Sequence, residues 1–192
     1  MPRGDARDRL LQRAIDHISQ RGLSDLSLRE LAAAIGTSHR MLIHHFGSKE
    51  GLWVEVIRAV EARQRELLPD IAADVAQDPA GATRAWWRHI SDPSLWPNER
   101  LFFEVYGQAL QGRPGTTELL DGIIDSWLDP ITAIYMDQGL DRDTARARGR
   151  LGIAVTRGLL LDLLATGDRQ EADAAMEQWI ALNEFALDSD TV

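Results

Sequence analysis

Cysteine is absent from the 192 residues of this chain. Without thiols the protein can form neither disulfide bonds nor thiolate metal sites, so its fold must rest on a buried apolar core. A chain of this length can bury such a core without covalent staples. The hydrophobic share of 44% and the charged share of 27% are those of ordinary globular proteins, which argues against disorder of the whole chain.

Long apolar runs are also lacking. The longest candidate, residues 151–165, is interrupted by Arg157 and Asp162, whereas a membrane-spanning helix needs about 20 apolar residues. The first eight residues are rich in charged side chains and no apolar run follows them, so they do not form a secretory signal. We therefore expect a cytoplasmic protein without a membrane partner.

Motifs of catalytic and metal sites are missing as well. The chain contains no His-Glu-x-x-His, no Gly-x-Ser-x-Gly and no phosphate-binding loop. His39 precedes His44 and His45 by five and six residues, not by the four that place two ligands on one helix face. We expect no enzyme activity, no metal and no cofactor. Two carboxylate pairs are interpreted as surface charge: Asp121 with Asp125, and Glu99 with Glu104.

Basic residues are few but concentrated near the N-terminus. The net charge is −9, yet residues 1–65 hold 11 Lys and Arg against 8 Asp and Glu, a local charge of +3. Four of the five histidines lie in the same stretch. Phosphate binding needs a local basic face, not a basic whole chain. Because an ordinary solvated helix surface can also carry +3, this signal needs the support of a motif.

Helical periodicity dominates the sequence, and patterns typical of strands are scarce. We expect an all-α protein of about nine helices, with a three-helix head in residues 1–50 and a helical body in residues 51–192. Gly22 is expected to cap the first helix, and Pro130 to kink the seventh. The predicted helices cover residues 7–20, 28–34, 38–45, 48–68, 81–90, 98–110, 116–137, 143–166 and 169–187.

Residues 27–46 have the pattern of a helix-turn-helix. Ser27 and Glu30 form a capping box that opens a helix, and Gly36 permits the sharp turn to the next one. Apolar residues fix the crossing of the two helices: Leu28, Leu31, Ile35, Leu42 and Phe46. The outer face then presents groups suited to base edges and phosphates: Thr37, Ser38, His39, Arg40, Ile43 and His44.

This segment resembles the TetR (tetracycline-repressor) family of bacterial regulators. The resemblance runs from Ile15 to Leu52 and is carried by Gly22 and by residues 26–32, 35–38, 42 and 44–52, with a specific Phe-x-Ser-Lys-Glu-x-Leu end. It implies that the helix at residues 38–45 enters the major groove of DNA. It implies further that Ser27 and Lys49 contact phosphates, which agrees with the affinity of helix N-termini for anions.

The sequence departs from the family pattern at two positions. Arg40 stands where the family often has a small residue, and Ile43 stands where it usually has a tyrosine that contacts the DNA backbone. An arginine at residue 40 can compensate for the missing contact by pairing with a guanine or with a phosphate. Both pairings stay open.

The resemblance also implies that the last two helices form a four-helix bundle with a second copy of the chain. The helix at residues 143–166 is apolar on more than one face, as burial on both sides requires; burial within one subunit is the alternative. A dimer would read two half-sites of a near-palindromic operator. The predicted interface residues are Leu159, Leu163, Trp179, Ile180 and Asn183.

Six tryptophans are many for a chain of this length, and all six lie in the body. The family resemblance implies that the body binds a small organic effector. Aromatic-rich cavities suit such ligands, although aromatic stripes are also typical of cores. The predicted pocket residues are Trp86, Trp87, Phe102, Phe103, Tyr106, Trp127 and Tyr135.

The leading hypothesis is therefore a repressor that an effector releases from DNA by population shift. Its expected partners are double-stranded operator DNA, a second copy of the chain and a small organic effector. The alternatives are an activator or an architectural DNA-binding protein of the same fold, and a small helical enzyme, which the missing motifs disfavour.

Overall fold

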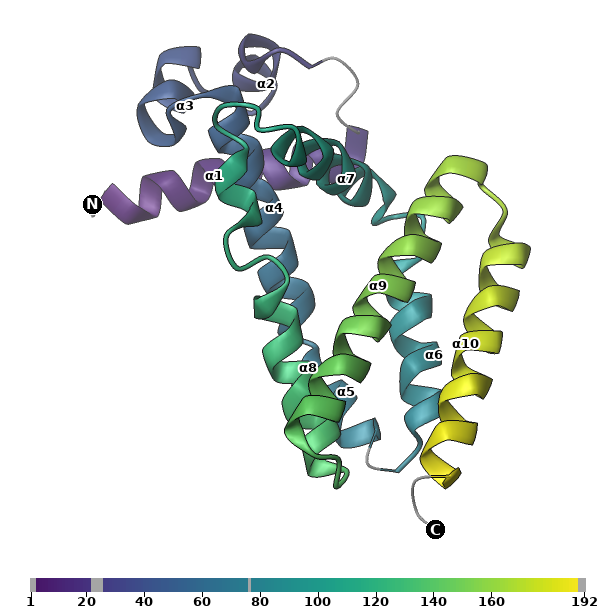
Figure 1. Cartoon of the computed structure of the whole chain (residues 1–192). Coiled ribbons are helices and arrows are strands. Elements are labelled where there is room, and N and C mark those ends of the chain that lie inside the picture. The colour runs from purple at the N-terminus through teal and green to yellow at the C-terminus, as the bar shows by residue number, and fades with distance from the viewer. Residues whose placement is uncertain (1–2, 22–25, 76, 190–192) are drawn as a thin grey trace. The chain divides into compact units, whose positions relative to one another are not determined.

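The computed structural model describes residues 3–21, 26–75 and 77–189 (Figure 1), and within them it contains helices and no strand, which confirms the all-α prediction. None of the helices in these ranges combines the length and the apolar character needed to cross a membrane. The elements are α1 (Arg3–Arg21), α2 (Leu28–Ala34), α3 (His39–Phe46), α4 (Lys49–Arg65), α5 (Leu68–Val75), α6 (Pro79–Ile90), α7 (Trp96–Leu110), the 3-10 helix η1 (Thr117–Leu120), α8 (Asp125–Asp137), α9 (Arg142–Thr166) and α10 (Arg169–Ser189).

The chain divides into two compact units, each built from two stretches of sequence. The first unit consists of Met1–Gln64 and Pro93–Ile123, and so contains α1 to α4, α7 and η1. The second consists of Arg65–Asp92 and Ile124–Val192, and so contains α5, α6 and α8 to α10. The predicted division after residue 50, between a DNA-binding and an effector-binding part, stays a prediction.

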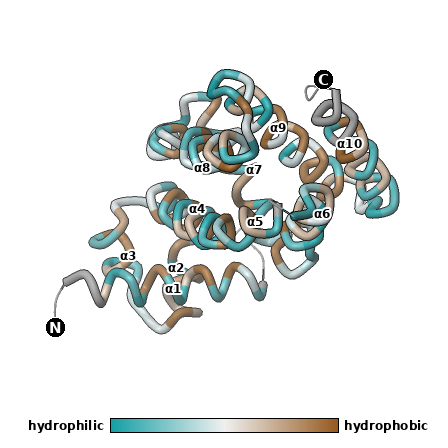
Figure 2. Tube along the Cα trace, turned by 90° about the horizontal axis from the view of Figure 1, so that it is seen from below, coloured by the Kyte–Doolittle hydropathy of each residue, from teal (hydrophilic) through white to brown (hydrophobic). Residues whose placement is uncertain are grey.

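The first unit has an apolar core to which all four N-terminal helices contribute. Along α1 the trace alternates between apolar and polar residues (Figure 2), which places Ala14, Ile15 and Ile18 inside. Helix α7 packs against α1, and Ser19 Oγ lies 3.2 Å from Oδ1 and 2.9 Å from Nδ2 of Asn98. The predicted core of the helix-turn-helix is confirmed, because all its members are buried: Leu28, Leu31, Ile35, Leu42 and Phe46.

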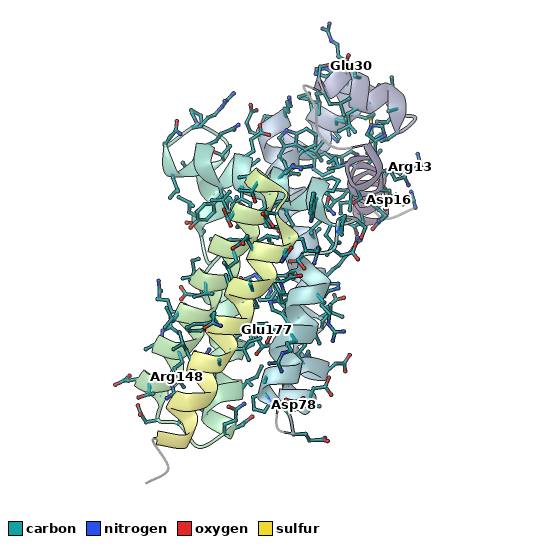
Figure 3. All side chains as sticks on the ribbon, turned by 90° about the vertical axis from the view of Figure 1, so that its right-hand side faces the viewer. Arg13, Asp16, Glu30, Asp78, Arg148 and Glu177 are labelled. Atoms are coloured by element: carbon teal, nitrogen blue, oxygen red, sulfur yellow. The ribbon has the colours of Figure 1, made fainter. Side chains whose placement is uncertain are left out.

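The second unit is a bundle in which α9 packs against α8 and α10, and α10 also packs against α6 (Figure 1). Helices α8 and α9 approach closely at Gly149, where an added Cβ would lie 3.1 Å from Cγ2 of Ile131. Helices α6 and α10 are joined by an ion pair between Arg84 and Glu177 at 2.8 Å; Glu177 is labelled on α10 in Figure 3.

Two helix predictions are corrected by the structure. The helix predicted at residues 48–68 is shorter, because α4 ends at Arg65. Pro69 lies in the first turn of α5, where a missing N–H costs no hydrogen bond. The helix predicted at residues 116–137 is divided into η1 and α8, because Gly122 adopts a φ of 70° that no helix continues. Pro130 lies inside α8, and Gly22 lies outside the described residues.

We expect the core of the first unit to be sensitive to Leu42 and insensitive to Leu110. Leu42 is 0% exposed and Leu110 is 65% exposed, so Leu42→Ala should leave a cavity and lower the free energy of unfolding by about 2–5 kcal/mol. Leu110→Ala serves as the matched control and should change it by less than about 0.5 kcal/mol. Urea unfolding followed by circular dichroism measures both; equal losses would contradict the packing described here.

Candidate nucleic-acid interface

Helix α2 begins with the capping box that the sequence predicts. The Ser27 hydroxyl accepts a hydrogen bond from the backbone N–H of Glu30 at 3.3 Å, and the Glu30 carboxylate accepts one from the backbone N–H of Ser27 at 2.8 Å. Both side chains are exposed. The hydrogen bonds to Ser27 lower the pKa of Glu30 below its ordinary value of 4.5. The N-terminus of α2 is therefore fixed in place and open to solvent.

A tight turn joins α2 to α3. Gly36 has a φ of 69°, a left-handed conformation that glycine adopts without a Cβ clash. The backbone N–H of Thr37 donates to the carbonyl of Ala32 at 2.9 Å, which closes the turn. Ser38 then caps α3, because its hydroxyl accepts a hydrogen bond from the backbone N–H of Met41 at 3.2 Å. Thr37 is half-buried and Ser38 is exposed.

Helix α3 has one buried face and one open face. Leu42 and Phe46 point into the core, while the opposite side presents Arg40, Ile43 and His44 to solvent, with His39 exposed next to them. At 3.6 residues per turn, Ile43 and His44 are the neighbours of Arg40 on the next turn. Arg40 thus lies in the middle of the open face, and α3 contains no acidic residue to oppose it.

The start of α4 adds a second helix N-terminus. The Ser48 hydroxyl accepts a hydrogen bond from the backbone N–H of Gly51 at 2.9 Å, so Ser48 caps this helix. Lys49, the single lysine of the chain, is half-buried, and its ammonium group lies 5.9 Å from the centre of the Trp53 ring. The carboxylate of Glu50 lies 3.7 Å from a nitrogen of Arg113, which partly offsets its negative charge.

An arginine from α1 holds α3 and α4 together. The guanidinium of Arg7 lies over the ring of Phe46, 5.3 Å from its centre, and pairs with the carboxylate of Glu55. His45 is half-buried, and its ring centre lies 5.0 Å from that of His44. Cation–π and packing contacts of this kind orient α3 relative to α1 and α4.

Comparison with known proteins identifies this arrangement. A family model described as "Bacterial regulatory proteins, tetR family" matches residues 10–56. The HTH-type transcriptional regulatory protein RaaS of Mycobacterium tuberculosis is 27% identical over 164 residues, which span 80% of this chain and 68% of RaaS. The chain is therefore similar to the TetR family of DNA-binding transcriptional regulators. Members of this family are not enzymes.

Solved structures share the fold of this chain. A transcriptional regulator from Rhodococcus sp. Rha1 superposes with a TM-score of 0.72 at 21% identity, covering 92% of this chain and 94% of its own. The multidrug binding protein EbrR, solved as a complex with imidazole, superposes with a TM-score of 0.58 at 25% identity, covering 92% and 90%. The first likeness shows the all-α fold with its N-terminal helix-turn-helix.

The aromatic residues predicted to line an effector pocket fall into both units of the chain. In the first unit, Phe102 stacks on Tyr106 with 5.4 Å between ring centres, and Phe103 meets Phe102 at 5.2 Å. In the second unit, Trp86 and Trp127 are 5.5 Å apart. Trp87 Nε1 donates to Asp173 at 2.6 Å, and burial raises the pKa of the Tyr135 hydroxyl. Their role as pocket residues stays a prediction.

A buried polar cluster in the first unit was not predicted. Glu99 is buried, which corrects its interpretation as surface charge, and its carboxylate accepts a hydrogen bond from Gln64 Nε2 at 2.8 Å. Glu61, Asn98 and Phe102 line a small cavity together with Glu99, with room for about one water molecule. Glu99 stands three residues before the buried Phe102, and this spacing on one helix face could have revealed its burial.

The residues predicted for the dimer interface differ in exposure. Leu163 and Ile180 are 0% and 2% exposed; α9 packs against α8 and α10, and α10 packs against α6 as well, within the second unit. Leu159, Trp179 and Asn183 are half-buried. The large apolar side chains that α9 and α10 leave exposed in the described residues are different ones, namely Leu151, Leu161 and Leu182.

We expect the pKa of Glu30 to report the capping box. Ser27→Ala removes the hydroxyl partner, so the pKa of Glu30 should rise toward 4.5. Since the pKa of Glu30 is lowered in the folded chain, the box stabilises α2 at neutral pH, and this contribution is lost as the pH falls through the folded pKa. An NMR titration of the Glu30 carboxyl carbon measures the shift. Ser38→Ala, which removes another cap, is the control and should leave it unchanged.

Proposed function

We propose that this regulator is a homodimeric repressor that binds a near-palindromic DNA operator and is released from it by a small organic effector. The observation that carries the proposal is the open face of α3, on which Arg40 lies between Ile43 and His44. Leu42 and Phe46 are buried on the opposite face and anchor the helix in the core. A short, rigidly held helix with a polar open face is what a major groove accepts.

The proposed DNA contacts divide by chemistry. Arg40 provides a planar fork of donors for a guanine edge or a phosphate. Exposed helix N-termini, where Ser27 and Ser38 stand, offer N–H groups and a positive dipole end to phosphates, and Lys49 adds a charge at the start of α4. The other proposed contact residues on or before α3 are Thr37, His39, Ile43 and His44.

Dimerisation through α9 is supported by the residues that this helix leaves exposed. They include Leu151 and Leu161, each about half exposed. Together with small neighbours they form a stripe that advances by four and three residues in turn, the spacing of a helix–helix seam. The stripe consists of Ala147, Leu151, Ala154, Gly158, Leu161 and Ala165, all exposed. Its alanines and glycine would let a second α9 approach closely.

Release by an effector is supported by two observations. The neighbour EbrR is described as a multidrug binding protein and was solved with imidazole bound. The aromatic residues of α6, α7 and α8 provide apolar surface of the kind that organic ligands select. An effector that binds more tightly to the conformation with low DNA affinity would lower operator occupancy by the ratio of its two affinities.

DNA binding is tested with duplexes selected from a random library by the purified full-length protein. Arg40→Ala and Lys49→Ala should each weaken binding. Lys49→Ala should also reduce the salt dependence, since a phosphate contact contributes a slope of about −0.9, and Arg40→Ala should do so only where Arg40 pairs with a phosphate and not with a guanine. Arg142→Ala, which removes an exposed arginine from α9, is the charge-matched control and should bind like the native chain. In cells, a reporter driven by the selected duplex should be repressed by the native chain and released by Arg40→Ala.

The single lysine gives an independent readout of the same contact. An amine-reactive reagent should modify Lys49 in the free protein, and bound duplex should protect it, as peptide mass spectrometry can measure. Failure to select any duplex would refute the proposed function. Selection of a duplex that leaves Lys49 reactive would refute only the role of Lys49, and activation of the reporter would refute repression.

The dimer is tested by charge placed on the α9 stripe. Leu161→Glu puts a carboxylate where two copies of the stripe would meet, so it should convert dimer to monomer in sedimentation equilibrium. Leu110→Glu is the matched control, because Leu110 is also exposed but lies at the end of α7. A Leu161→Glu protein that stays dimeric would exclude this face as the interface.

A further inference from the structure

Helix α3 carries two large apolar side chains that its own fold leaves in solvent. Met41 is 40% exposed and Ile43 is 37% exposed, whereas Leu42 between them is fully buried. Single exposed apolar residues are common on protein surfaces and need no explanation by themselves. Ile43 differs because it stands one turn after His39 and Arg40, inside the polar face that the proposed function places against DNA.

The chemistry of a major groove restricts what Ile43 can contact there. Its aliphatic side chain has no donor or acceptor, so it cannot bond a phosphate as a tyrosine could. If Ile43 packed against a polar base atom (N7, O6, N4, N6 or O4), it would remove water from that atom without providing a hydrogen bond in its place. The 5-methyl group of thymine is the one apolar group among the base edges of this groove.

The composition of α3 points the same way. Side chains of asparagine and glutamine recognise adenine by paired hydrogen bonds, and the sequence of α3, His39–Phe46, contains neither. An A·T pair beneath this helix is therefore most readily read from its thymine side. Ile43 is suited to such reading, because a β-branched side chain in a helix is nearly confined to one χ1 rotamer. Met41 is flexible and adapts to many surfaces.

We propose that Ile43 is a specificity-determining residue that packs on the 5-methyl group of a thymine in each operator half-site. The assignment rests on the proposed function, since it requires α3 to lie in the major groove. It predicts an operator in which an invariant A·T pair adjoins the base or phosphate that Arg40 contacts.

Deoxyuridine tests the assignment, because it differs from thymidine only by the missing methyl group. The duplex selected by the full-length protein is resynthesised with deoxyuridine at one thymine position at a time, in both half-sites together. Replacement of the thymine that Ile43 contacts should lower the affinity of the native chain by about fourfold for each methyl group removed. This factor corresponds to the loss of one buried CH₂-sized group. Deoxyuridine outside the half-sites should have no effect.

Protein variants then assign that methyl group to a side chain. Ile43→Ala should bind the thymidine and the deoxyuridine duplexes with equal affinity, while its circular dichroism stays that of the native chain. Leu110→Ala is the matched control: it also shortens an exposed apolar side chain of the first unit, and it should retain the full preference for thymidine.

Three results would overturn the proposal while leaving DNA binding intact. The half-sites could lack thymine, deoxyuridine could leave the affinity of the native chain unchanged at every position, or the preference for thymidine could persist in Ile43→Ala. A failure to select any duplex would instead overturn the proposed function itself, and with it this inference.

Discussion

The burial of Leu42 and Phe46 on one side of α3 is the contact on which the head of this protein depends. These two side chains anchor an eight-residue helix that is too short to be stable alone. Because they fix the rotation of α3 about its axis, they also decide that Arg40, Ile43 and His44 face outward. The chemistry of the open face is thus a consequence of apolar packing on the opposite face.

Caps and turns complete what the core begins. Ser27, Ser38 and Ser48 each accept a hydrogen bond from the first turn of a helix, so that α2, α3 and α4 start at defined residues. Gly36, before α3, and Gly47, directly after it, have positive φ values. A protein that presents two or three helix N-termini to an anionic ligand needs these boundaries fixed, because the dipole effect acts only within the first turn.

Helix α9 meets different requirements on its different sides. Leu160 and Leu163 pack inside the second unit, and Gly149 allows the close approach of α8. The opposite side leaves Leu151 and Leu161 half exposed. The folded chain therefore buries only some of the apolar side chains of α9. The exposed ones support the proposal that a second copy packs against this helix.

The sequence alone determined the helix-turn-helix of this chain, because its signals are local. A capping box spans four residues, and the alternation of core and surface residues repeats within one turn of helix, so Leu28–Ala34 could be predicted to the residue. Only the tertiary structure decided which side chains the longer helices bury. The partner of the buried Glu99 is Gln64, 35 positions away, and α9 packs against both α8 and α10; no pattern within one helix identifies such partners. On a helix that is apolar most of the way round, neighbours distant in sequence decide which side chains are exposed. These side chains could therefore be identified only from the folded structure.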